Sequence, residues 1–216
     1  MKKTVLFLVV VLSSMGASAQ QYWDSSRADQ LVTFGIRAGV NASKQYAMDD
    51  QADRDFHLGY QVGVAVDLNL ARSFSINTGL TMIQKGWHWD YDDSRGKQDV
   101  KDNATYLEIP IQASYRVALS DQAQFQLNLG PYFAFGLFGD QKVTSTFPNG
   151  DNYSIDTFDE FEGGKKFDCG VTVGAGFVFS HIYLGVSYER GLINVSNDEN
   201  KRFQNSTIAL SIGYNF

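Results

Sequence analysis

The sequence predicts an all-β fold: an eight-stranded antiparallel up-and-down transmembrane β-barrel with short periplasmic turns and long external loops. Three observations predict it. Apolar and polar residues alternate with a period of two in eight segments. The connections between these segments are alternately short and long, and the chain ends on an aromatic residue of an apolar face, Phe216. The 20 glycines, 16 phenylalanines and 11 tyrosines beside only three prolines also suit many strands.

The eight segments follow one another with a regular order of connections. They cover residues 32–40, 58–70, 74–82, 107–119, 125–137, 167–179, 182–188 and 206–216. Long polar connections lie at about 42–56, 86–103, 139–166 and 191–205, and tight turns lie near 71–72, 120–122 and 180–181. Up-and-down barrels in outer membranes have this order, with both termini on the side of the short turns.

The N-terminus has the pattern of an export signal. Lys2 and Lys3 precede the apolar run Val5 to Leu12, and Ala17-Ser18-Ala19 supplies the small residues that a signal peptidase needs. A membrane anchor is the alternative, but a spanning helix needs about 20 apolar residues. We therefore expect residues 1–19 to be a cleaved signal, 20–30 a periplasmic stretch and 31–216 the barrel domain.

The last segment is expected to close the barrel and to direct its assembly. Ile208, Leu210, Ile212, Tyr214 and Phe216 share one face of a strand. A terminal strand that ends on an aromatic residue is typical of outer-membrane barrels, so we expect Tyr214 and Phe216 to be the signal for the barrel-assembly machinery. Closure requires this strand to pair with residues 31–41, because lipid offers no partner to an open edge.

A soluble lipocalin-like barrel would also show eight alternating strands. The polar faces argue against it, because they carry Gly, Ala, Ser, Thr, Asn and Gln rather than many Lys and Glu. Aromatic residues also gather at both ends of the apolar faces, as at the two interfaces of a membrane. These aromatics are Phe74, Tyr115, Phe125, Phe179, Tyr214 and Phe216 at one rim, and Tyr60, Phe135, Phe167 and Tyr188 at the other.

The charge balance limits the partners. Loss of Lys2 and Lys3 with the signal takes the formal charge from −6 to −8, which argues against nucleic acid. The single cysteine, Cys169, cannot form an internal disulfide. Outer-membrane lipid and the assembly machinery are the expected partners, with a possible protein partner at the external loops.

Seven charged residues fall on the lumen faces: Arg37, Asp67, Lys85, Glu108, Arg116, Asp168 and Glu189. Side chains fill the interior of an eight-stranded barrel, so we expect ion pairs and a plugged lumen. Arg37 is expected to be the central cation, and Lys85 and Glu108 should lie at one level. A small gated pore or a ligand site is the alternative.

Catalytic, cofactor and metal sites are not expected. Residues 90–101 resemble the start of an EF-hand, but Arg95 and Lys101 stand where the motif needs Gly and Glu. An outer-membrane protease or acyltransferase is the enzyme alternative. It would combine His57 or His88 with Asp55, Asp90 or Ser94, whereas His181 lies at the opposite end.

Several phrases together resemble the PorT-like outer-membrane β-barrel family. They are Gln84-Lys85-Gly86, Tyr106 to Ile111, Gly130-Pro131-Tyr132, Asp168-Cys169-Gly170 with Gly174 and Gly176, Tyr188 to Leu192 with Asn194, and Gly213 to Phe216. The resemblance implies a barrel in the outer membrane of a Gram-negative bacterium. The family's namesake takes part in protein secretion, and the family supplies no catalytic residues.

The third long connection predicts a β-hairpin that projects beyond the membrane. Val143 to Phe147 and Tyr153 to Phe158 are β-prone runs that flank the turn signal Pro148 to Asn152. A projecting strand edge can pair with a strand of another protein. We therefore expect a non-enzymatic binding or scaffold component of the cell envelope, in adhesion or in a secretion complex.

Overall fold

A computed structural model describes residues 24–28, 30–47, 54–94, 96–147, 150–159, 164–197 and 202–216. The expected signal, 1–19, lies outside the described residues. Among those described, no helix has the length and the apolar character that a membrane crossing requires.

The described chain forms nine antiparallel strands, not eight. They are β1 Val32–Ala47, β2 Asp55–Ala71, β3 Phe74–Asp93, β4 Gly96–Ala118, β5 Ala123–Ser145, β6 Tyr153–Asp156, β7 Phe167–Phe179, β8 Ile182–Gly191 and β9 Phe203–Asn215. Eight of them close into a ring, in which each strand pairs with the next along the chain, β5 pairs with β7, and β9 pairs with β1. The additional strand, β6, pairs with β5 outside this ring.

The first and last strands close the barrel, as predicted. Their register runs from Gly35 opposite Asn215 to Ala47 opposite Phe203. Closure satisfies the backbone groups of both strands, which lipid could not do. The tight turn between β7 and β8 places Ser180 at a φ of 55°, a left-handed conformation that two-residue hairpin turns require.

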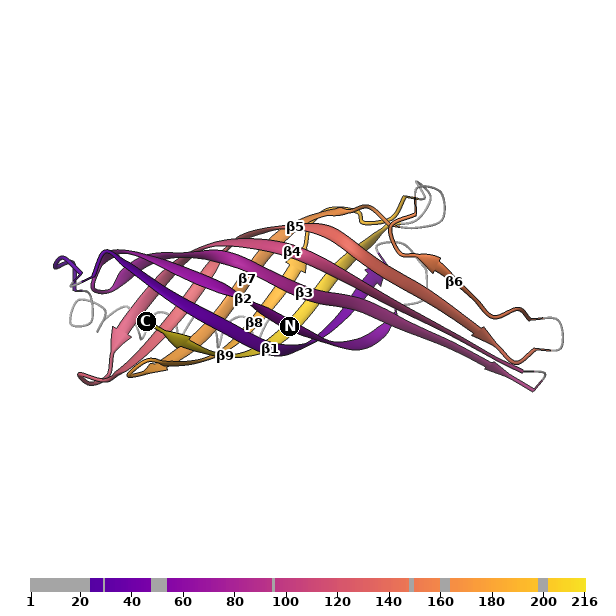
Figure 1. Ribbon diagram of the computed structural model, residues 1–216, viewed down its shortest axis with the longest axis horizontal. Helices are drawn as coiled ribbons and strands as arrows, with labels where there is room; N and C mark the ends of the chain where they lie inside the picture. The colour runs from indigo at the N-terminus through magenta and orange to yellow at the C-terminus, as the bar shows by residue number, and fades with distance from the viewer. Residues whose placement is uncertain are drawn as a thin grey trace, which may run out of the picture.

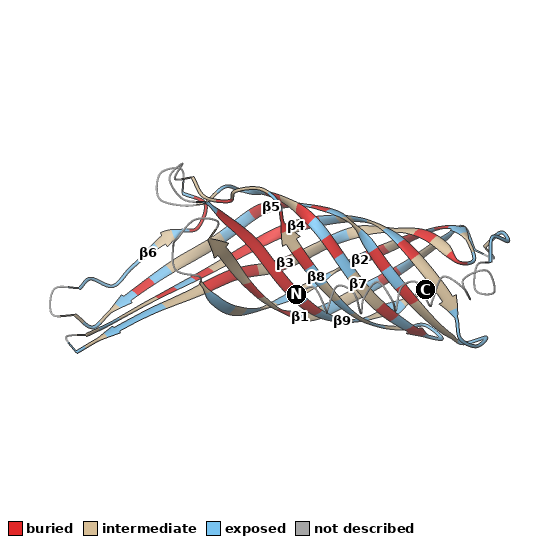
Figure 2. Ribbon diagram, turned by 180° about the vertical axis from the view of Figure 1, so that it is seen from behind, coloured by how far each residue is buried: buried red, intermediate tan, exposed pale blue. Residues whose placement is uncertain are grey.

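Alternation sorts the side chains between lumen and lipid (Figure 2). On β2, Leu58, Val62 and Val64 are exposed outward, whereas Ala65 and Asp67 are buried inside. Phe216 is 67% exposed at the end of β9's apolar face. An apolar outer surface around a polar lumen is the reverse of a soluble barrel, and it matches a membrane protein.

Parts of all four segments that the sequence predicts as polar connections are strands instead, most of all in the second and third. Residues 86–93 and 96–103 continue β3 and β4, and residues 139–145 continue β5. The physical reason is that Trp87, Trp89 and Tyr91 alternate with polar residues and pair with β4, so the hairpin stays regular past the apolar band. The predicted third-loop hairpin is confirmed, with Val143 opposite Tyr153.

We call this extension the projecting sheet. It comprises residues 87–93 of β3, 96–102 of β4, 139–145 of β5, and β6. Figure 1 shows it reaching well past the ends of the other strands. A bulge at Leu137 in β5, opposite Thr105 and Tyr106, shifts the face on which the later residues lie. Because of that shift Val143 shares a face with Val100 and Trp89.

Candidate functional site

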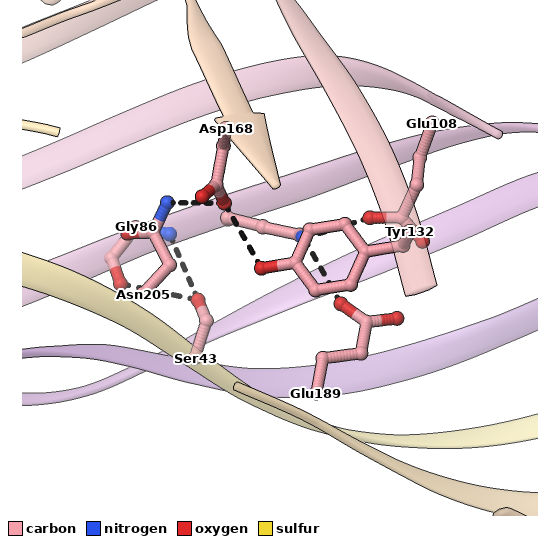
Figure 3. Close-up of polar contacts among 8 residues, drawn as sticks. Ser43, Gly86, Glu108, Tyr132, Asp168, Glu189 and Asn205 are labelled. Carbon is pink, nitrogen blue, oxygen red and sulfur yellow. Dashed lines mark hydrogen bonds and ion pairs between the residues drawn. The ribbon is translucent and has the colours of Figure 1, made fainter. Parts of the chain in front are cut away.

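The lumen contains a buried ion-pair triad (Figure 3). The Lys85 ammonium lies 2.7 Å from Glu108 Oε2 and 2.9 Å from Glu189 Oε2. Its nitrogen also lies 4.3 Å from the centre of the Tyr132 ring. These groups come from β3, β4, β5 and β8, so one ammonium ties four strands of the wall together. The predicted common level of Lys85 and Glu108 is confirmed.

Asp168 extends this cluster on the side of β7. Its Oδ2 accepts hydrogen bonds from the Tyr132 hydroxyl at 3.1 Å and from the Asn205 amide at 2.9 Å (Figure 3). Asp168 and Tyr132 are both completely buried. The sequence named Tyr132 only within the phrase Gly130-Pro131-Tyr132 and not as a lumen partner, although it lies on the lumen face of the predicted segment 125–137.

A second network occupies the lumen nearer the short turns. The Arg116 guanidinium lies 3.1 Å from Asp67 and also donates to Asn69. Asp67 accepts a further hydrogen bond from Asn77 at 2.7 Å. Arg37 stands apart from the triad: it donates to Asn215 at 2.6 Å and lies 4.2 Å from the centre of the Tyr183 ring. The expectation that Arg37 is the central cation is therefore wrong, because Lys85 is the buried one.

An apolar layer covers the triad on the side of the long loops. Phe158, which follows β6, meets Tyr106 edge-on at a ring distance of 5.5 Å. Its ring occupies the space where a Cβ on Gly136 would lie, so a larger residue at position 136 would displace the ring. Below the triad is a polar cavity of about 100 Å³, lined by Glu108, Glu189 and Arg37 among others. The charged network thus lies between an apolar cap and a cavity large enough for a few waters.

The projecting sheet has two unlike faces. One face continues the lumen side and is mainly aromatic and aliphatic, with Trp87, Trp89, Tyr91, Val100, Val143 and Tyr153, and with Asp93 at the tip. The other continues the lipid side and carries His88, Asp90, Asp92, Lys97, Asp99, Lys101, Asp140 and Lys142. In the barrel wall the lumen face is polar and the lipid face is apolar. In the projecting sheet the continuation of the lumen face is aromatic and the continuation of the lipid face is charged, and this reversal marks where the apolar band ends.

Rings and aliphatic groups pack on the aromatic face. Trp87, Val100 and Val143 form a buried cluster with Trp89 against it. Trp89 and Tyr91 stack at 6.2 Å, and Tyr91 and Phe147 stack at 6.4 Å. Tyr91 and Tyr153 remain about half exposed. This face is ordered by its own packing and still offers aromatic surface to a partner.

Ion pairs cross the strands of the charged face. His88 Nε2 lies 2.8 Å from Asp99, and Lys97 lies 2.9 Å from Asp92. Partial burial alone would raise the pKa of Asp99, but the His88 hydrogen bond and the Lys101 charge hold that pKa below its ordinary value. The hydrogen bond to Asp92 raises the pKa of Lys97. These pairs are solvent-exposed, so they order the surface more than they stabilise it.

Asp102 lies where the projecting sheet meets the barrel, on the aromatic side. It is 3% exposed and accepts a hydrogen bond from Thr157 at 2.7 Å. Burial raises its pKa to about 6, although the Thr157 hydrogen bond and the nearby Arg54 charge act in the other direction. Asp102 was not expected from the sequence, since it lies in a segment predicted as a loop.

The residues of the enzyme alternative lie on β2, on β3 and in the turn that follows β3. The His88 ring forms its ion pair with Asp99, although Asp55 lies directly opposite His88 in the register of β2 and β3. The Ser94 hydroxyl donates to Asp93 at 2.9 Å. His57, on β2, approaches Gly86 of the adjacent strand.

The closed ring, the apolar outer surface and the polar lumen define an outer-membrane β-barrel. The sequence profile of the family described as "Outer membrane protein beta-barrel domain" matches residues 19–197. The chain belongs to this family, and it is therefore an outer-membrane protein of the Gram-negative type. No curated protein matches it.

Solved structures of other outer-membrane barrels are similar at low identity. The attachment invasion locus protein Ail of Yersinia pestis is 15% identical with a TM-score of 0.44, over 87% of this chain and 100% of that one. OprG of Pseudomonas aeruginosa is 13% identical with a TM-score of 0.46, over 90% and 99%. Neisserial surface protein A is 10% identical with a TM-score of 0.41, over 85% and 97%. Identities this low say nothing about activity or partners.

Proposed function

We propose that this protein is a non-enzymatic binding component of the cell envelope, whose projecting sheet takes up a protein partner outside the cell. The sheet is the observation that carries the proposal. It extends β3, β4 and β5 past the apolar band and adds β6 at its edge. A strand edge and a half-exposed aromatic face are both surfaces that proteins use to bind strands of other proteins.

The lumen supports a scaffold role better than a pore. The Lys85 triad, Tyr132 and the Phe158 layer fill the interior with side chains that hold one another by charge and packing. Such a core makes a rigid base for the projecting sheet. Both termini are placed in the periplasm in this proposal, since the first described residues, 24–26, and the C-terminal residues lie at the end with the short turns. The resemblance to PorT-like proteins favours an envelope or secretion complex as the setting.

Crosslinking in intact cells tests the proposal. The variant replaces residues 142–154 by Asn-Gly, which joins the paired residues Gln141 and Ile155 in a two-residue hairpin turn. It keeps Thr157 and Phe158, which pack at the barrel end. We expect the wild-type protein to crosslink partners that this variant loses. A partner set unchanged by the replacement, in a variant that still runs as a folded barrel on gels, would overturn the proposal.

The matched control changes the same sheet without shortening it. Lys142→Gln keeps the hairpin and alters one exposed charge, so the partner set should stay as in the wild type. One observation favours the enzyme alternative, namely the His88–Asp99 pair at 2.8 Å. Hydrolysis or acyl transfer by purified protein that His88→Ala abolishes would support the enzyme instead.

A further inference from the structure

The two edges of the projecting sheet differ in chemistry. At one edge β6 has only four residues. At the other edge the last pairing between β2 and β3 is Asp55 opposite His88. From Trp89 to Asp92, β3 pairs with β4 on one side, and no other described strand pairs with it on the other side. The free β3 edge, residues 89–92, is equally short, but it carries two carboxylates, Asp90 and Asp92, where β6 carries one, Asp156. The β3 edge therefore has the stronger charge with which to select an added strand.

This β3 edge presents a different chemistry on each face. Trp89 and Tyr91 lie on the aromatic face, and Asp90 and Asp92 lie on the charged face. Asp55 shares the charged face, because it pairs with His88. Side chains directly opposite each other on neighbouring strands interact, favourably for opposite charges and for aromatic or β-branched pairs. The edge therefore specifies the pattern of the strand that would fit it.

We propose that the β3 edge binds an extended polypeptide strand that alternates basic and apolar residues. This inference rests on the proposed function and names the partner's chemistry. Lysine or arginine side chains of the added strand lie against Asp90 and Asp92. Its β-branched or aromatic side chains lie against Trp89 and Tyr91, while backbone hydrogen bonds join the two strands.

Charge decides against a second copy of this chain as the occupant. Pairing two β3 edges antiparallel would place Asp90 and Asp92 of one copy against the same carboxylates of the other. Like charges directly opposite each other destabilise a strand pair. The carboxylates thus oppose self-association and select a basic strand from another protein.

Peptide binding to the full-length protein in detergent micelles tests the inference. The probe is a ten-residue peptide of alternating lysine and valine with blocked ends, and the readout is calorimetry at low salt. A second peptide has the same sequence with every other backbone nitrogen methylated, and a third replaces lysine by glutamate. We expect the first peptide to bind at least tenfold more tightly than either of the others.

Protein variants complete the experiment. Asp90→Asn with Asp92→Asn should weaken binding of the lysine peptide about tenfold, and Asp90→Lys with Asp92→Lys should reverse the preference toward the glutamate peptide. Asp140→Asn, on the interior strand β5, is the matched control and should leave binding unchanged. Equal binding of the methylated peptide, or a preference that does not reverse, would overturn the inference. Absence of binding by the wild-type protein would also overturn the inference. The carboxylates would then serve only to prevent aggregation through the β3 edge.

The intact-cell assay separates this inference from the proposed function. Partners lost on replacement of residues 142–154 but kept by Asp90→Lys with Asp92→Lys would refute the β3 edge and leave the proposed function standing. Partners kept by both variants would refute both. Loss in both variants is the result that the inference predicts.

Discussion

Replacing Lys85 by methionine tests the buried triad most severely. The substitution keeps the length and volume of the side chain but removes the one ammonium that pairs with both Glu108 and Glu189, at 2.7 and 2.9 Å. Both carboxylates are more than nine-tenths buried, so bulk water does not reach them, and the few waters that the adjacent cavity can hold do not replace the charge of the ammonium. Removing one member of a buried ion pair costs about 3–5 kcal/mol. We expect Lys85→Met to lower the free energy of unfolding by an amount in this range.

A compensated variant shows whether charge is the cause. Lys85→Met with Glu108→Gln and Glu189→Gln removes the charges together, and it should recover at least half of the lost stability. The exposed Lys142→Met is the control and should change stability by less than about 0.5 kcal/mol. Urea unfolding in phospholipid vesicles, followed by tryptophan fluorescence, measures all three variants. A cost below about 1 kcal/mol for Lys85→Met, or a triple variant no more stable than the single one, would refute the reasoning.

Three further predictions follow from the same structure. Burial raises the pKa of Asp102 to about 6, above the ordinary 3.8, so the folded junction binds the proton more tightly than the open one. The free energy of opening the junction should therefore be highest below about pH 4 and should fall by up to about 3 kcal/mol as the pH rises through 6. Hydrogen exchange at the junction measures this, and Asp102→Asn should remove the dependence; identical pH profiles for the two proteins would contradict it. Deletion of Phe216 should reduce the amount of protein in the outer-membrane fraction far more than Asn215→Ala, and equal amounts would contradict an assembly role for the terminal aromatic. Purified protein in planar bilayers should show no steady large-conductance channel, since side chains fill the lumen; such channels would favour the pore.

Most of the barrel was predictable because the membrane makes alternation strict. Each residue of a spanning strand faces lipid or lumen, so segments such as 58–70 and 206–216 show their structure in the sequence. The closure of β9 on β1 followed from the same physics, since lipid tolerates no open edge. The lumen positions of Lys85, Glu108, Asp168 and Glu189 came from the period of two alone.

The β3–β4 part of the projecting sheet was missed, unlike the β5–β6 hairpin, because this constraint ends at the water interface. Beyond it both faces of a strand can be polar, and the charges of residues 86–103 resemble a loop. The alternation of Trp87, Trp89 and Tyr91 was the signal that could have identified the extension. Pairing across the lumen was also beyond the sequence, because the tilt and stagger of the strands decide which charges meet. For that reason Arg37 was expected at the centre, where Lys85 lies.

Cysteine labelling in intact cells tests the central claim, that the projecting sheet lies outside the cell on a barrel with periplasmic short turns. In a Cys169→Ala background, Ser94→Cys and Ser154→Cys mark the projecting sheet, and Asp121→Cys marks the short turn between β4 and β5. A membrane-impermeant maleimide should label the first two in intact cells and the third only after the outer membrane is permeabilised. Labelling of Asp121→Cys in intact cells, with Ser94→Cys and Ser154→Cys protected, would contradict the account.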